Sequence, residues 1–181
     1  MNIRKVSTIT TLTALCIATN YVLAGIHQVK IMDFIVFIGG FCLGPLMGAS
    51  IGILSWLVYG TMNPYGFVPQ VWLATMFSET IYGLVGGLLR ARFVPTDFKG
   101  VRLRLSIFFG AIGFISTFFY DLATNVVYAS VFNVSVIVAL FFGAPFTILH
   151  QVSNAAIFGM SSIPVITVLE KLLGSERVVV S

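Results

Sequence analysis

The chain has very few charged residues. Of its 181 residues, 10 are Lys or Arg and 6 are Asp or Glu, together 9% of the sequence, whereas 58% are apolar. A soluble domain carries about 25% charged residues, so this chain could not cover its surface with polar groups in water. The scarcity of charge excludes a soluble fold and indicates an integral membrane protein.

Cysteine and catalytic motifs are equally scarce. Cys16 and Cys42 are the only cysteines and both lie in apolar segments, which excludes a disulfide framework and a zinc site. The sequence holds no Gly-x-x-x-x-Gly-Lys phosphate loop and no His-Glu-x-x-His motif. No basic face is expected outside the bilayer, which argues against nucleic acid as a partner. We therefore expect no enzyme activity, no cofactor and no metal.

The charged residues divide the chain into apolar segments of membrane-spanning length. About 20 residues of helix cross a bilayer, and the segments 6–26 and 71–89 each fit one crossing. The segment 34–60 is ambiguous, because its 27 residues could cross once, or twice with a turn at Gly44-Pro45. The positions of the basic residues decide between these alternatives.

Five basic residues follow the segment 71–89, and Lys and Arg favour cytoplasmic loops. They are Arg90, Arg92, Lys99, Arg102 and Arg104. If the segment 34–60 crosses twice, this stretch lies on the same side as Arg4 and Lys5. We therefore predict an all-α integral membrane bundle of six transmembrane helices, a single domain over residues 1–181 with both termini cytoplasmic. The predicted helices are 6–26, 31–43, 46–60, 71–89, 105–132 and 135–169.

Glycine and proline add detail to two of these segments. Small residues let membrane helices pack closely, and the second and third helices are rich in glycine. The glycines concerned are Gly39, Gly40, Gly44, Gly48 and Gly52. Pro145 and Pro164 predict that the last helix is broken or strongly tilted, with a re-entrant segment near 134–142 as the alternative.

Three ionisable residues fall at membrane depth, where each needs a partner or a function. They are Glu79, Asp121 and His150. Asp121 and Asn125 share a helix face, because they are four residues apart. We predict an outward-facing polar pocket whose carboxylates bind a polar solute and whose aromatic side chains stack on its ring. The alternative is that these groups only form hydrogen bonds between helices.

Further residues belong to the predicted pocket. Tyr82 and Tyr128 add aromatic side chains to it, and the loop 61–70 is a candidate lid or an interfacial aromatic belt. The candidates from this loop and the following helix are Asn63, Tyr65 and Trp72. In the last helix, His150 lies near Gln151 and Asn154, a set that favours either a packing network or a pocket floor.

The N-terminal helix and the following turn are similar to those of a known transporter family. Thr13 to Asn20 contains Ala14 and Ala18 one helical turn apart, and Leu43-Gly44-Pro45-x-x-Gly48 forms the turn between the second and third helices. With six crossings, the chain resembles the substrate-binding S component of an energy-coupling factor (ECF) vitamin transporter.

The resemblance implies a function and partners. It implies that Ala14 and Ala18 dock on a transmembrane T component, which works with two ATPase subunits in the plasma membrane of a prokaryote. It also implies that the chain captures a vitamin-like solute outside the cell and topples within the lipid bilayer to deliver it. The identity of the solute stays open, and carboxylates facing the solute disfavour a strongly anionic one.

Two other functions stay open at this stage. One is a structural scaffold of a membrane complex, which would need no tight small-molecule ligand. The other is an intramembrane protease, because Phe146-x-x-x-His150 and His150-x-x-x-Asn154 are similar to elements of Abi-type prenyl proteases. That family also needs a paired glutamate element and a second membrane histidine, which this sequence does not offer.

Overall fold

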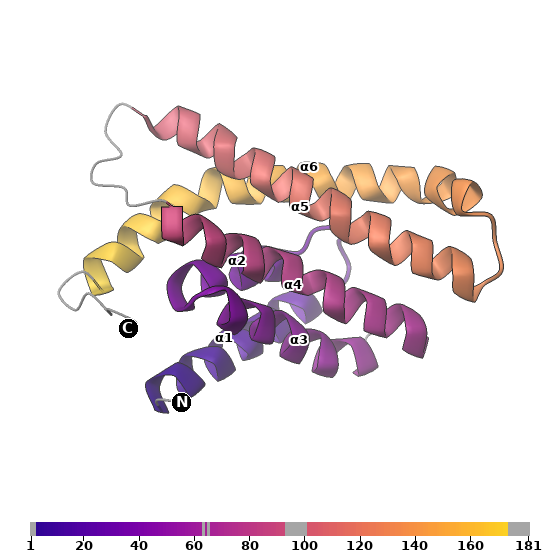
Figure 1. Cartoon of the computed structure of the whole chain (residues 1–181), viewed down its shortest axis with the longest axis horizontal. Helices are drawn as coiled ribbons and strands as arrows, with labels where there is room; N and C mark the ends of the chain where they lie inside the picture. Colours follow the sequence, from indigo (N-terminus) through magenta and orange to yellow (C-terminus); the bar gives the residue numbers. More distant parts are fainter. Residues whose placement is uncertain (1–2, 63, 65, 93–100, 174–181) are drawn as a thin grey trace.

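A computed structural model describes residues 3–62, 64, 66–92 and 101–173 of the chain. Within these residues the fold consists of six α-helices without a β-strand (Figure 1). Their bounds are α1 Ile3–Val22, α2 Ile31–Leu43, α3 Pro45–Met62, α4 Pro69–Arg92, α5 Arg102–Val131 and α6 Val136–Leu173. The number of helices and their all-α class agree with the prediction from the sequence.

The helix boundaries lie close to the predicted ones, with two differences of note. The first helix ends at Val22, four residues earlier than expected, and a loop reaches from there to Lys30. The last helix runs without interruption over 38 residues, although Pro145 and Pro164 lie inside it. Neither proline breaks the helix, and its start at Val136 is part of the same helix rather than a re-entrant segment.

A glycine contact joins α2, α3 and α4. Gly44 adopts a φ of 100°, which glycine tolerates, and Pro45 then begins α3 with a φ suited to a first helical turn. The turn brings Gly40 and Gly48 against Gly83 of α4, so closely that a Cβ atom on any of the three would collide with backbone. The predicted close packing of the glycine-rich helices is therefore present, and Gly83 extends it to a third helix.

Helix α2 forms the centre of the molecule. Ten of its 13 residues are buried, and it contacts α1, α3, α4 and α6. Its aromatic side chains pack into the core, where Phe37 contacts Phe109 of α5 and Phe158 of α6. A helix buried on all sides needs no polar face, which explains the uniformly apolar sequence between residues 34 and 43.

Among the described residues, four helices are long and apolar enough to cross a membrane: α3, α4, α5 and α6. Helix α2 is apolar but has only 13 residues, and the 20-residue α1 carries several polar side chains. Large apolar side chains are strongly exposed on α6, including Phe141 at 75% and Phe142 at 71%. Such a surface suits lipid rather than water.

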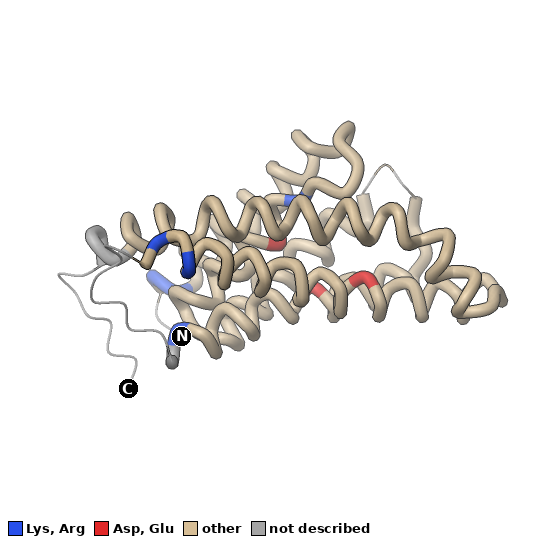
Figure 2. The backbone as a smooth tube through the Cα atoms, turned by 90° about the horizontal axis from the view of Figure 1, so that it is seen from above, with Lys and Arg blue, Asp and Glu red and all other residues tan. Residues whose placement is uncertain are grey.

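Basic residues gather at one end of the molecule. Arg4 and Lys5 begin α1, Arg90 lies at the end of α4, and Arg102 and Arg104 begin α5 (Figure 2). The start of α1 and the end of α6 also lie at this end (Figure 1). The Arg90 guanidinium donates hydrogen bonds to the carbonyl oxygens of Phe41 and Cys42, which end α2. This distribution is the one that the positive-inside tendency predicts for a cytoplasmic end.

Candidate functional site

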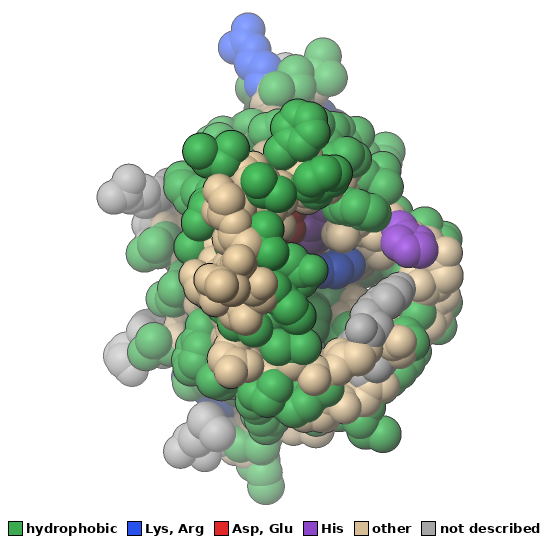
Figure 3. Space-filling view, turned by 90° about the vertical axis from the view of Figure 1, so that its right-hand side faces the viewer, with side chains coloured by type: hydrophobic (Ala, Val, Ile, Leu, Met, Phe, Trp, Pro, Cys, Tyr) green, Lys and Arg blue, Asp and Glu red, His purple; other side chains and the backbone are tan. Residues whose placement is uncertain are grey.

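A cavity opens at the end of the molecule opposite the start of α1 and the end of α6. It has a volume of about 240 Å³ and lies between the loop after α1, the outer part of α3 and α6. Figure 3 looks onto this end and shows a hollow with charged side chains inside a mostly hydrophobic rim. The residues that line it include Asn20, Gln28, Lys30, Trp56, Tyr59 and Phe146. It combines aromatic walls with a few polar groups, as small-molecule sites do.

The loop after α1 is held over this cavity by α6. Gln28 has a φ of 59°, an uncommon conformation for a residue with a side chain. Its carbonyl oxygen accepts a 2.8 Å hydrogen bond from the Ser153 hydroxyl, which ties the loop to α6. The loop therefore has one fixed point on the helix that faces it.

Lys30 lies at the inner side of the cavity. Its Nζ is 5.4 Å from the ring centroid of Trp56 and 5.1 Å from that of Tyr120. No described carboxylate forms an ion pair with it within 4 Å. A cation over an aromatic face gains about 0.5–2 kcal/mol, depending on desolvation. The two rings thus form a place for a positive charge.

Deeper in the bundle, His150 bridges two carboxylates. Its Nε2 lies 2.8 Å from Asp33 Oδ2, and its Nδ1 lies 3.1 Å from Asp121 Oδ1. Carboxylates only accept hydrogen bonds, so both ring nitrogens carry hydrogen when both aspartates are ionised. The side chains of His150 and Asp33 are almost completely buried, at 0% and 1% exposure. This is a charged network in the middle of an apolar bundle.

Asn154 extends the network to α4 and α5. Its amide nitrogen donates to Asp33 Oδ2 at 2.7 Å and to Thr117 Oγ1 at 2.7 Å. The hydroxyl groups of Thr117 and Tyr82 lie 3.0 Å apart. Four helices, α2, α4, α5 and α6, thus meet in one hydrogen-bonded set, which fixes their mutual positions.

Glu79 lies on the α3 side of the network. Trp56 donates its indole N–H to Glu79 Oε2 at 3.0 Å, and the Glu79 side chain is completely buried. Trp56 lines the cavity and also donates a hydrogen bond to Glu79, so its side chain lies between the cavity and this buried carboxyl group.

The structure joins four of the predicted site residues and places them below the cavity. All four are buried; Tyr82, Asp121 and His150 belong to the hydrogen-bonded network, whereas Glu79 accepts a hydrogen bond from Trp56. None of the four lines the cavity in this conformation. The side chain of Asp121 keeps 11% exposure.

The other predicted site residues are more scattered. Asn125 donates to the carbonyl oxygen of Asp121, and Tyr128 is exposed and packs against Phe132. Trp72 is partly buried and donates its indole N–H to the carbonyl oxygen of Trp56. Asn63 and Tyr65 lie outside the described residues.

Three residues of the site did not stand out in the sequence. Asp33 and Lys30 read as charges in a loop between apolar segments, and Trp56 as one of many aromatic residues. The available signal was that Asp33 directly precedes eleven apolar or glycine residues, 34–44, where a carboxylate needs a buried partner. A pairing with His150, 117 residues away, has no local signature.

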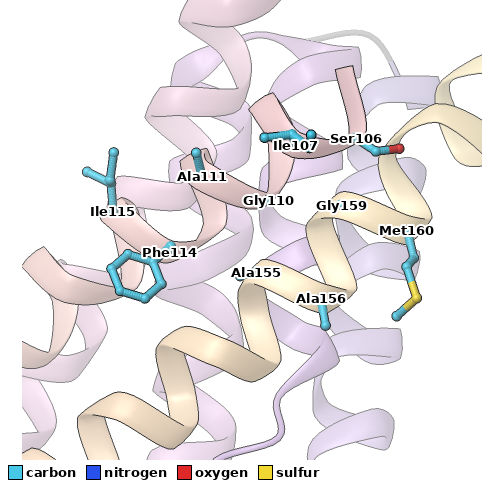
Figure 4. A pocket seen from close by; sticks show the side chains of 10 residues that line it. All are labelled: Ser106, Ile107, Gly110, Ala111, Phe114, Ile115, Ala155, Ala156, Gly159 and Met160. Atoms are coloured by element: carbon cyan, nitrogen blue, oxygen red, sulfur yellow. The ribbon is translucent and has the colours of Figure 1, made fainter. Parts of the chain in front are cut away.

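A second hollow lies on the outer surface of α5 and α6 (Figure 4). Its volume is about 610 Å³, and its lining is almost entirely apolar. Gly110 of α5 faces Ala155 and Gly159 of α6, so the hollow is the shallow groove left where small residues let two helices approach. It lacks the converging polar groups of a binding site.

One short sequence pattern of hydrolases occurs but is not in the matching structural context. Gly48-Ala49-Ser50-Ile51-Gly52 fits Gly-x-Ser-x-Gly, yet it lies within α3 and the Ser50 hydroxyl donates to the carbonyl oxygen of Leu46. A nucleophilic serine of that class sits on a strand-to-helix turn. Among the residues that the structure describes, no cluster of His, Cys, Asp and Glu could hold a metal ion.

A sequence model of one protein family matches residues 8–168, and that family is described as the ECF transporter substrate-specific component. The chain belongs to this family. No curated protein and no solved structure matches the chain. As a substrate-specific component with long apolar helices, it is a membrane-embedded transport subunit, and its family is one of transporter components rather than enzymes.

The docking residues expected for an S component lie on the surface. Ala14 and Ala18 of α1 are both exposed and share one helix face. With Leu15 beside them at 48% exposure, they form a low strip without large side chains at two successive turns. The surface is open to a neighbouring helix.

Proposed function

We propose that this chain captures a small vitamin-like solute outside the cell and passes it to an ECF transporter. The observation that supports this most is the cavity at the end opposite the basic residues, in a chain that matches the substrate-specific component over residues 8–168. If the basic end faces the cytoplasm, the cavity faces outward. The plasma membrane of a prokaryote is the corresponding location.

The size of the cavity limits the solute. A volume of 240 Å³ corresponds to roughly eight water molecules at about 30 Å³ each. It is somewhat smaller than the roughly 300–1,000 Å³ of typical ligand pockets. The proposed solute is therefore a compound of one or two rings, stacked against Trp56 and Tyr59. A corrinoid would need a much wider opening.

Transport needs partners that supply energy, because the described residues contain no phosphate-binding loop. We infer that a transmembrane T component packs on α1 at Ala14 and Ala18, and that two ATPase subunits act through it. Small residues one turn apart allow two helices to lie close together, which suits a contact formed within lipid.

Purification from the native membrane tests this function. The tagged chain, extracted in a mild detergent, is expected to carry with it a second membrane protein and two ATPase subunits, identified by protein mass spectrometry. Recovery with an unrelated membrane complex and without ATPases would favour the scaffold instead. A scaffold would also tolerate Asp121→Ala without any change in small-molecule binding.

A further inference from the structure

The buried network below the cavity has hydrogen-bond acceptors without donors. Asp33 Oδ1, Glu79 Oε1 and Asn154 Oδ1 receive no hydrogen bond from any described residue. All three residues are completely buried. Buried polar atoms are almost always paired, so three unpaired buried acceptors indicate a donor group that is brought from outside. That group has to donate hydrogen bonds.

Lys30 marks the route by which such a group would approach. Its ammonium lies over Trp56 and Tyr120 and interacts electrostatically with Asp33 and Glu79. The same side chain lines the cavity, as does Trp56. A solute that enters the cavity therefore meets the Lys30 ammonium before it meets the carboxyl groups.

The site around this ammonium is built for a cation. It has two aromatic faces, and Lys30 interacts electrostatically with the buried Asp33 and Glu79 carboxyl groups. The face of an aromatic ring attracts a cation and repels an anion. An anion here would also approach Asp33, Glu79 and Asp121 together, and like charges at short range in a buried site are costly.

This inference rests on the proposed function and names the substrate class. We propose that the transported solute is a small ring compound bearing a positively charged nitrogen group, which replaces the Lys30 ammonium between Trp56 and Tyr120. The lysine side chain is long and flexible, and it swings toward the mouth of the cavity when the solute enters. In the protein without solute, the Lys30 ammonium thus occupies the position between the two rings that the cationic group of the solute would take.

Three single-ring probes that differ in charge test the proposal on the unmodified protein. They are benzamidine, which is cationic, benzamide, which is neutral, and benzoate, which is anionic. We expect benzamidine to bind the purified protein at least about tenfold more tightly than benzoate in calorimetric titration. Equal binding of the three, a preference for benzamide or benzoate, or no binding of benzamidine overturns the proposal.

Removing the Lys30 ammonium should increase the affinity of the protein for a cationic probe. Lys30→Met keeps much of the side-chain length and is expected to tighten benzamidine binding by about tenfold, since no tethered cation then has to leave. Lys5→Met, on α1 far from the cavity, is the matched control and should leave the affinity unchanged. If benzamidine binding is unchanged, or benzoate binds the native protein and loses affinity in Lys30→Met, Lys30 recognises an anion or nothing and the proposal fails.

Failure of this inference is distinguishable from failure of the proposed function. The charge preference is measured on the isolated chain, whereas the function is tested by the ATPases that purify with it. A protein that brings its ATPases but prefers benzoate is a transporter subunit with an anionic solute. One that prefers benzamidine but never brings ATPases is a cation-binding protein of another kind.

Discussion

At the scale of single residues, His150 is the side chain on which the buried network depends. It contacts Asp33 on one side and Asp121 on the other, and thus joins α2, α5 and α6. A buried charged group that loses its partner has no water to compensate it. Removing one member of the network should therefore lower the stability of the folded protein strongly.

Replacing His150 by leucine should unfold the protein at a lower temperature. His150→Leu leaves Asp33 and Asp121 without their shared donor, and a broken buried pair typically costs about 3–5 kcal/mol. Thermal unfolding in detergent, followed by intrinsic fluorescence, measures the effect. His27→Leu at the exposed loop position is the matched control, and an exposed substitution changes stability by about 0.5 kcal/mol or less. Equal stabilities of the two variants would contradict the role of His150.

The buried polar residues of the bundle are easier to find in the sequence than the residues that line the cavity. Carboxylates and a histidine inside apolar segments are conspicuous, so Glu79, Asp121 and His150 could be selected from composition alone. Asp33 and Lys30 lie at the boundary between a loop and α2, where charge is ordinary. Only the folded chain shows that Asp33 points into the bundle and that Lys30 lies over two rings.

At the scale of helices, the glycine contact between α2, α3 and α4 sets the packing of the half of the bundle that carries Trp56 and Glu79. Gly83 lies against the backbone of Gly48 and Ala49. No side chain fits between two backbones that approach so closely. The position of α4 relative to α3, and with it the hydrogen bond between Trp56 and Glu79, follows from this contact.

A single methyl group at Gly83 should therefore be destabilising. Gly83→Ala places its Cβ against backbone that cannot move as a flexible side chain would, and overpacking costs about 1–3 kcal/mol. Gly25→Ala is the matched control, because nothing lies within 4 Å of a Cβ at that position. Thermal unfolding of the two variants compares them directly. A Gly83→Ala protein as stable as Gly25→Ala would show that these helices have room to separate.

Substitutions in the exposed strip of α1 should show whether it is the docking surface for the proposed T component. Ala14→Trp combined with Ala18→Trp fills the low strip, so the proposed T component can no longer lie close to the helix. We expect the double variant to fold normally and to lose the co-purifying ATPases by more than about tenfold. Ala111→Trp, at an exposed position on α5, is the control and should keep them. Unchanged recovery of ATPases with the double variant would place the docking surface elsewhere.

Helices were easier to predict than their mutual arrangement. Segment length, the basic residues after α4 and the turn at Gly44-Pro45 were sufficient for six helices with nearly correct ends. Of the two predicted forms of α6, broken or strongly tilted, the break is absent, because a long helix packed against its neighbours tolerates the lost hydrogen bonds. That α2 is central and α6 continuous depends on packing between distant segments, which local patterns do not record.

At the scale of the whole molecule, charge divides the chain into two ends and a core. Most described basic residues lie at one end, the carboxylates of Asp33, Glu79 and Asp121 are buried, and the cavity with Lys30 opens at the other end (Figures 2 and 3). The outer surface along α5 and α6 is apolar and carries many large side chains. This distribution of charge is compatible with the proposed movement of the subunit within lipid.

The most direct test of this account measures small molecules that stay with the purified protein. Mass spectrometry of extracts should detect one ring compound at close to one equivalent per chain in the native protein. Ala24→Trp, which places a large side chain into the cavity lining, should lose this compound, whereas Gly25→Trp, at the adjacent exposed position, should retain it. Absence of any such compound under several growth conditions, or its equal retention by both variants, would contradict a solute-binding cavity at this end of the molecule.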